Sequence, residues 1–197
     1  AVSSIYIAGN YGYTIIQNST IQSDFFIFDI SNHSSPVILG SIDLVATGIK
    51  VYVSGKYAYI TTNVSANTCS GIILDGCEFR IYDVSNPDFP QPVGGIDIGG
   101  TTRDVFISGK YAYIVKANAG LTNDFIIIDI SNPKMPLITG GDDFGTEGYA
   151  IYVSGRYAYI AKQNSGTYAN DLIIYDVSNP YSPTTSAEMG FDLLTSP

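Results

Sequence analysis

The sequence contains no tryptophan, one histidine and few charged side chains. Charged residues make up 14% of the chain, against roughly 25% in an ordinary globular domain. Acidic residues outnumber basic ones by 18 to 9, and the formal charge of -9 argues against nucleic acid as a partner. No apolar run approaches the roughly 20 residues of a membrane-spanning helix, so we expect no membrane span.

The same scarcities limit the chemistry that the chain can perform. His33 is the only histidine, so a metal site of the histidine and cysteine type lacks ligands, and a serine nucleophile lacks an obvious base. No glycine-rich phosphate loop stands between a strand and a helix. We therefore predict no catalytic residue, no cofactor and no enzymatic activity. The 18 acidic residues leave a carboxylate-based hydrolase open as an alternative.

Several features favour an extracellular or cell-surface location. The chain begins at Ala1 rather than at methionine, so we expect either a removed leader or an excerpt of a longer protein. Cys69 and Cys77, the only cysteines, lie close together and predict one disulfide, which forms readily outside the cell. Export would also make the three sequons at Asn18, Asn32 and Asn63 candidates for glycosylation.

A hairpin pattern with a central glycine occurs four times. The turn glycines are Gly9, Gly55, Gly109 and Gly155. A second motif, Asp-Ile/Val-Ser-Asn, follows each hairpin and begins at Asp29, Asp83, Asp129 and Asp176. The distance from turn glycine to this marker aspartate is similar in three repeats, whereas repeat two is about eight residues longer there and carries both cysteines in the extra segment. Such an insertion belongs in a surface loop.

Each repeat predicts four short strands and no helix. β-branched and aromatic residues dominate the strands, and Gly, Asn, Ser and Pro mark their ends. In the Tyr-Ala-Tyr unit the tyrosines share one face and the alanine points to the other, so bulky faces can pack on shallow ones. A four-stranded sheet covered on both faces and repeated every 46 to 54 residues is a propeller blade.

We therefore predict an all-β fold, a β-propeller of four four-stranded blades in one domain, 1–197. The blades are expected at about 1–48, 49–102, 103–148 and 149–197. Ring closure would rest on blade one packing against blade four, unless the four blades are part of a larger ring.

The repeated residues resemble a known family. The run from Val51 to Ile60, Val-Tyr-Val-Ser-Gly-Lys-Tyr-Ala-Tyr-Ile, and the later Ile-Tyr-Asp-Val-Ser-Asn-Pro from Ile81 to Pro87 look like the LVIVD repeat, a β-propeller repeat of bacterial and archaeal surface or exported proteins. The resemblance covers nearly the whole chain and implies the propeller fold. It implies no activity, and the Arg-Asp pair that family repeats often carry before the first strand occurs only at Arg103 and Asp104.

Acidic residues offer two possible binding sites. The marker aspartates are expected to close turns through their side chains; the alternative is that they face a shared channel and bind a ligand. Asp142, Asp143 and Glu147 form the densest acidic cluster, a weak candidate for calcium because it lacks the alternating spacing of a dedicated calcium loop. A solvated polar turn is the competing interpretation.

The composition favours a non-enzymatic structural or interaction protein that acts by self-assembly or adhesion. Its partner would be copies of itself, and a contact that does not close would make a filament. The insertion carries Ile72, Ile73 and Leu74 between the cysteines, and we predict that these residues are buried against another chain or a neighbouring blade. The alternative is a binding module for a glycan or small ligand at the propeller mouth.

Overall fold

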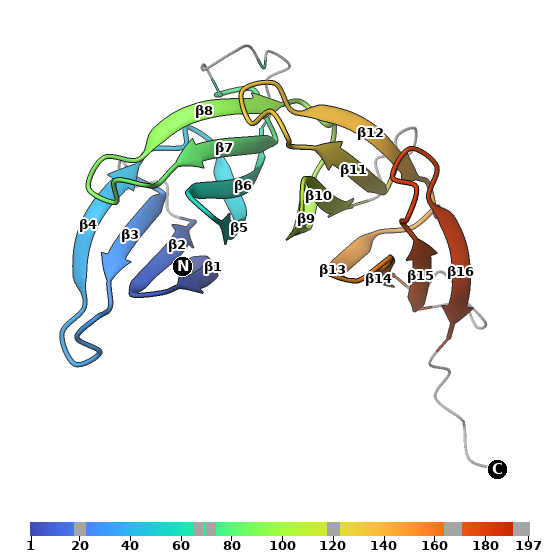
Figure 1. Ribbon diagram of the computed structural model, residues 1–197, viewed down its shortest axis with the longest axis horizontal. Coiled ribbons are helices and arrows are strands. Elements are labelled where there is room, and N and C mark those ends of the chain that lie inside the picture. Colours follow the sequence, from blue (N-terminus) through green and yellow to red (C-terminus); the bar gives the residue numbers. More distant parts are fainter. Residues whose placement is uncertain (18–22, 65–68, 70–73, 118–122, 164–170, 191–197) are drawn as a thin grey trace. The chain divides into compact units, whose positions relative to one another are not determined.

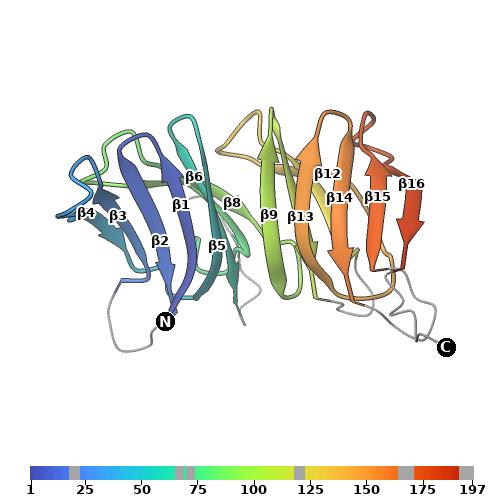
Figure 2. The ribbon, with the colours of Figure 1, turned by 90° about the horizontal axis from the view of Figure 1, so that it is seen from below.

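The computed structural model describes residues 1–17, 23–64, 69, 74–117, 123–163 and 171–190. These residues form sixteen strands and no helix, so no described helix is suited to crossing a membrane. The strands build four separate four-stranded sheets, in each of which they lie side by side in chain order (Figure 1). Figure 2 shows the up-and-down course of the strands. The predicted all-β fold with four four-stranded blades is confirmed.

Each blade takes four consecutive strands. Blade one contains β1 (Val2–Ala8), β2 (Tyr11–Ile16), β3 (Phe25–Asp29) and β4 (Val37–Ile42). Blade two contains β5 (Thr47–Ser54), β6 (Tyr57–Asn63), β7 (Phe79–Asp83) and β8 (Gln91–Ile96). Blade three contains β9 (Thr102–Ser108), β10 (Tyr111–Lys116), β11 (Phe125–Asp129) and β12 (Leu137–Asp142). Blade four contains β13 (Gly148–Ser154), β14 (Tyr157–Lys162), β15 (Leu172–Asp176) and β16 (Thr184–Met189).

The first hairpin of every blade turns on a glycine. Ala8 pairs with Tyr11, and Ser54 pairs with Tyr57, so each loop has only two residues. The first of them is glycine with φ near +59°, at Gly9 and Gly55 and likewise in the other two blades. A two-residue loop with glycine in its first position is the type II′ turn, whose twist matches that of the flanking strands.

The chain divides into two compact units. The first contains Ala1–Thr102 and Ile130–Leu137, and therefore blades one and two whole. The second contains Arg103–Asp129 and Ile138–Pro197, and therefore blade four and most of blade three. Each unit has its own hydrophobic core, which lies between the two sheets that it contains.

Candidate functional site

Neighbouring blades pack through two faces of different composition. In the first unit, blade one presents a face that we call the tyrosine face, made of Tyr13, Ile15, Phe25 and Ile27. It packs against a receiving face on blade two, made of Val51, Val53, Ala58, Ile60, Tyr82 and Val84. Because the small residues of one sheet face the rings of the other, the core closes without large voids.

The second unit repeats this arrangement at equivalent positions. Its tyrosine face belongs to blade three and consists of Tyr113, Val115, Phe125 and Ile127. Its receiving face belongs to blade four and consists of Ile151, Val153, Ala158, Ile160, Ile173, Tyr175 and Val177. The pairing of tyrosine face with receiving face is therefore a rule of the repeat and not a feature of one site.

A hydrogen bond joins the first strands of the two blades in each unit. The backbone N–H of Val51 donates to Ser4 Oγ at 3.2 Å. In the second unit, the N–H of Ile151 donates to Asp104 Oδ2 at 3.0 Å. The acceptor stands five residues before the turn glycine in both cases, and we call this contact the edge hydrogen bond.

The same sheets also touch at their fourth-strand edge. A Cβ added to Gly40 of β4 would overlap the carbonyl oxygen of Pro87 in blade two. A Cβ added to Gly140 of β12 would overlap the carbonyl oxygen of Pro180 in blade four. Glycine is needed at these positions because one backbone lies directly against another. In each unit the fourth strand of the first blade thus lies against the loop that precedes the fourth strand of the second blade.

One face of blade one and one face of blade four are exposed. Ile5 and Ile7 occupy the receiving face of blade one and are 65% and 52% exposed, whereas the equivalent Val51 and Val53 of blade two are both 5% exposed. In the second unit, Tyr159 on the tyrosine face of blade four is 37% exposed, whereas Tyr13 and Tyr113 are each 4% exposed. Each terminal blade therefore exposes the type of face that is buried elsewhere.

The insertion of blade two is tied to the core by its disulfide. Cys69 and Cys77 are bonded to each other, and Cys77 is fully buried. Leu74, one of the three predicted interface residues, is also buried, in the core cluster that blades one and two share. It packs against the neighbouring blade of its own chain and is not available to another chain. The other two, Ile72 and Ile73, lie outside the described residues.

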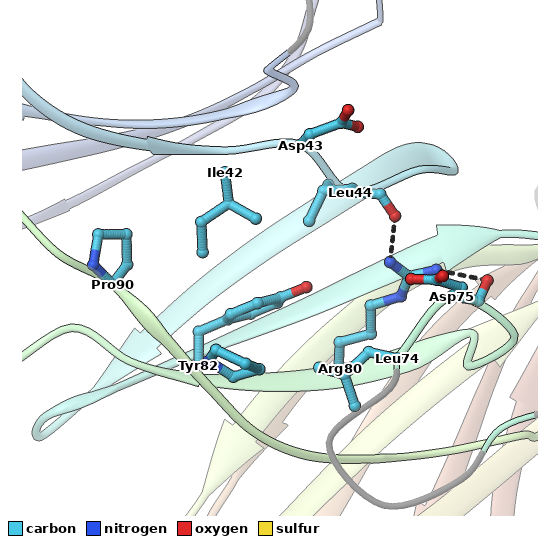
Figure 3. A pocket seen from close by; sticks show the side chains of 9 residues that line it. Ile42, Asp43, Leu44, Leu74, Asp75, Arg80, Tyr82 and Pro90 are labelled. Atoms are coloured by element: carbon cyan, nitrogen blue, oxygen red, sulfur yellow. Dashed lines mark hydrogen bonds between the residues drawn. The ribbon is translucent and has the colours of Figure 1, made fainter.

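A cavity of about 380 Å³ lies beside this insertion (Figure 3). Its lining includes Arg80, Tyr82 and Leu74. Arg80 is 1% exposed and donates to three backbone carbonyl oxygens, those of Cys77, Leu44 and Asp75. Burial raises the pKa of the Tyr82 hydroxyl, and the Arg80 charge opposes that shift. The guanidinium therefore ties the insertion to the loop that enters blade two.

Sequence reasoning missed Arg80, although a signal was present. The equivalent residues of the other third strands are Phe26, Ile126 and Ile173, all apolar. A charged residue among apolar equivalents, in the one repeat with an insertion, indicates that the two changes belong together. No described carboxylate forms an ion pair with Arg80; three backbone carbonyls and the Tyr82 hydroxyl lie around its charge.

The acidic residues proposed for calcium are engaged by other groups. Asp142 accepts from the Tyr175 hydroxyl at 2.7 Å, Asp143 accepts from the Gly145 N–H at 2.9 Å, and Glu147 pairs with Arg103 at 2.8 Å. Within the described part of the chain, no group of three or more acidic, histidine or cysteine side chains could hold a metal ion. The described residues therefore contain no ligand cluster of the kind that the calcium interpretation requires.

Asp124, in the second unit, is an acidic residue with an unusual environment. Asp124 is fully buried, and neither carboxylate oxygen has a hydrogen-bond partner among the described residues. Burial, followed by the neighbouring Asp143 carboxylate, raises the pKa of Asp124 to about 6, while the Gly145 backbone and, less strongly, Lys116 oppose the shift. Sequence reasoning did not single out this residue, because nothing local distinguishes it from a solvated aspartate.

The marker aspartates build turns, as expected. Asp29, Asp83 and Asp176 each accept from the backbone N–H two residues later, at 2.8 to 2.9 Å. Asp83 also pairs with Lys56 at 2.9 Å, and this hydrogen bond is the first cause that lowers the pKa of Asp83 to about 2. These carboxylates are occupied within their own blades.

The three sequons have different surroundings. Asn32 is exposed, and its side-chain oxygen accepts from the Ser34 N–H at 3.1 Å. Asn63 is half-buried, and its side-chain oxygen accepts from the Thr102 N–H at 3.0 Å. Asn18 lies outside the described residues. Of the two described asparagines, only Asn32 is fully accessible to a modifying enzyme, and it remains a glycosylation candidate.

The repeats match a family model at the positions that form the blades. The LVIVD repeat model matches residues 1–44, 48–64, 99–141 and 147–189. The chain belongs to the LVIVD-repeat family. The break in the match between 64 and 99 includes the cysteine-containing insertion and most of the residues that line the blade-two cavity. No curated protein sequence matches the chain.

Solved structures support the propeller fold of this LVIVD-repeat chain. A functionally unknown protein from Desulfotomaculum acetoxidans superposes on all of this chain and 58% of its own length, with a TM-score of 0.72 and 15% identity. A periplasmic gluconolactonase from Pseudomonas aeruginosa covers 95% of this chain and 56% of its own, with a TM-score of 0.68 and 13% identity. The computationally designed protein Ika4 covers 96% of this chain and 92% of its own, with a TM-score of 0.59 and 9% identity.

These identities show a shared fold and nothing more. The chain also spans less than two thirds of the Desulfotomaculum protein and of the gluconolactonase. Those two propellers therefore contain more chain than this sequence supplies.

Proposed function

We propose that this LVIVD-repeat protein is a non-enzymatic extracellular protein that acts by self-assembly through the faces of its terminal blades. The observation that carries the proposal is the exposure of Ile5 and Ile7, when their equivalents in the covered blades are buried. Water contact with such a face is unfavourable in proportion to its apolar area, and an uncovered apolar face on a soluble protein marks an interaction site.

The location rests on the disulfide between Cys69 and Cys77. Structural disulfides of this kind persist in oxidising compartments and are rare in the cytosol. The low content of charged side chains, 14% of the chain, suits a surface that makes repeated contacts with other proteins. These two features support an extracellular setting for the assembly.

The two alternatives have less support in the geometry. The blade-two cavity could hold a small ligand, but Arg80, the buried cation in its lining, already donates to three backbone carbonyls. For a carboxylate hydrolase, Asp124 has a suitably raised pKa, but its full burial keeps it from a substrate. Neither site presents a free reactive group to solvent, so assembly through blade faces is the function that the structure supports best.

Light scattering over a range of protein concentrations tests the proposal. The wild-type chain should associate, and the double variant Ile5→Glu/Ile7→Glu should associate at least about tenfold more weakly, since two charges would be buried in the contact. Met135→Glu is the matched control, because Met135 is 75% exposed and lies outside both blade faces. Equal association by the double variant and the wild type would contradict the proposal.

A further inference from the structure

We propose that the occupant of the receiving face of blade one is the tyrosine face of blade four from a second copy of the same chain. Two such contacts would join two chains into one closed pair. This inference rests on the proposed function and adds to it the identity of the partner, the face that the partner uses and the number of chains.

The first argument is complementarity. Both units show the same rule, in which a tyrosine face packs on a receiving face. The four positions of the tyrosine face in blade four hold Tyr159, Ala161, Leu172 and Ile174, and all four are at least partly exposed. Blade one exposes the matching receiving face through Ile5 and Ile7. Each chain thus presents both halves of a contact that it already makes twice.

The second argument concerns symmetry. The two exposed faces differ in composition. If one of them packed on the same face of a second chain, aromatic rings would lie against rings, or small residues against small residues. A contact between unlike faces is heterologous, and such contacts either close into a ring or continue as a filament. Closure therefore depends on how many blades the joined chains bring together.

The third argument is that the two exposed faces do not cover each other within one chain. The paired blades of each unit pack closely at their first strands, where the ring centroids of Tyr6 and Tyr52 lie 4.7 Å apart and those of Phe106 and Tyr152 lie 4.8 Å apart. Ile5 of blade one and Tyr159 of blade four nevertheless remain exposed. A further blade is therefore needed to cover each of them.

A ring of such blades needs more than four of them. Propellers contain typically 4–8 blades, and two chains of four blades supply eight. A second copy carries the two faces that the contact requires.

The edge hydrogen bond supplies an independent probe of this contact. In the proposed pair, the backbone N–H of Ile5 would meet residue 150 of the partner copy, by analogy with Val51 on Ser4 and Ile151 on Asp104. Residue 150 is alanine, which has no side-chain acceptor. The substitution Ala150→Ser should restore the bond and tighten association by about fivefold, the equivalent of one net hydrogen bond.

The decisive experiment uses two variants, each with one blocked face. Ile5→Glu/Ile7→Glu blocks the receiving face, and Tyr159→Glu/Ala161→Glu blocks the tyrosine face at two exposed positions. Sedimentation velocity should show pairs for the wild type and single chains for each variant alone. An equimolar mixture should form 1:1 pairs, because one intact contact remains between the two variants. Circular dichroism checks that both variants keep their sheets.

The possible failures are separable. If Ile5→Glu/Ile7→Glu leaves association unchanged, or if the wild type stays a single chain, the proposed function fails together with this inference. If that variant dissociates but the mixture does not pair, or if Tyr159→Glu/Ala161→Glu still pairs alone, only the identity of the partner face is wrong. Growth beyond two chains with concentration would overturn closure. No change on Ala150→Ser would overturn the assigned register.

Discussion

Arg80 Nε donates to the carbonyl oxygen of Cys77 at 2.8 Å, and this contact joins the third strand of blade two to the cysteine that closes its insertion. The other donors of the same guanidinium reach Leu44 and Asp75. A buried cation in a blade core is costly, and here three backbone carbonyl oxygens, of Cys77, Asp75 and Leu44, offset that cost. The insertion and the arginine are therefore one structural unit.

Substitution of Arg80 should destabilise the first unit. Arg80→Met fills a similar volume but leaves the Leu44 and Asp75 carbonyl oxygens without this donor, while the Cys77 carbonyl keeps the Thr62 hydroxyl. The free energy of unfolding should therefore fall by about 3 kcal/mol. Urea denaturation measures the change, and Arg156→Met, at an exposed position, is the control. A loss no larger than that of the control would show that solvent replaces the guanidinium.

Asp124 should make the stability of the protein depend on pH. The pKa of Asp124 in the folded state, about 6, lies above its ordinary value of 3.8. Between pH 3.8 and pH 6, the folded state therefore keeps a proton on Asp124 that the unfolded state has released. Stability should therefore fall as the pH rises from about 4 to 6, by on the order of 2 kcal/mol from this residue, and should change little above that range.

The substitution Asp124→Asn isolates this contribution. The amide cannot ionise, so the variant should be more stable than the wild type at pH 7, and the difference should shrink as the pH approaches 4. Urea denaturation at several pH values measures it, with the exposed Asp88→Asn as control. A difference that is constant across this range would mean that Asp124 titrates normally.

Two glycines of blade one should respond differently to alanine. Gly40→Ala would press a methyl group onto the Pro87 carbonyl and should cost about 2 kcal/mol or more. Gly9→Ala meets no atom within 4 Å but keeps φ at +59°, so it should cost about 1 kcal/mol through backbone strain alone. Thermal unfolding compares the two, and equal costs would argue against close contact at the fourth-strand edge.

The disulfide should contribute to stability without defining the fold. Its loop is short, so replacing both cysteines by alanine should cost roughly 2–3 kcal/mol. The far-ultraviolet circular dichroism spectrum should keep its β-sheet form, because the insertion lies outside the repeated blade. Mass spectrometry of unreduced peptides should show Cys69 linked to Cys77 in the wild type, and two alkylatable thiols would contradict the extracellular assignment.

The four blades and their hairpins were predictable because their signals are local. The turn at Gly55 requires only a positive φ between two strands, and Asp83 closes its turn with a residue two positions away. Alternation along each strand decides which side chains share a face. Repetition then applies the same result four times, so the sequence by itself determined the strands, their order and the two kinds of blade face.

Only the tertiary structure decided which copy of each face is covered. Ile5 and Val51 hold equivalent places in the repeat, yet one is exposed and the other buried, because only Val51 has a blade packed on it. Arg80 and Leu44 are 36 residues apart, and the pKa of Asp124 depends on burial and on Asp143. These properties arise from contacts between distant segments, which a local pattern does not encode.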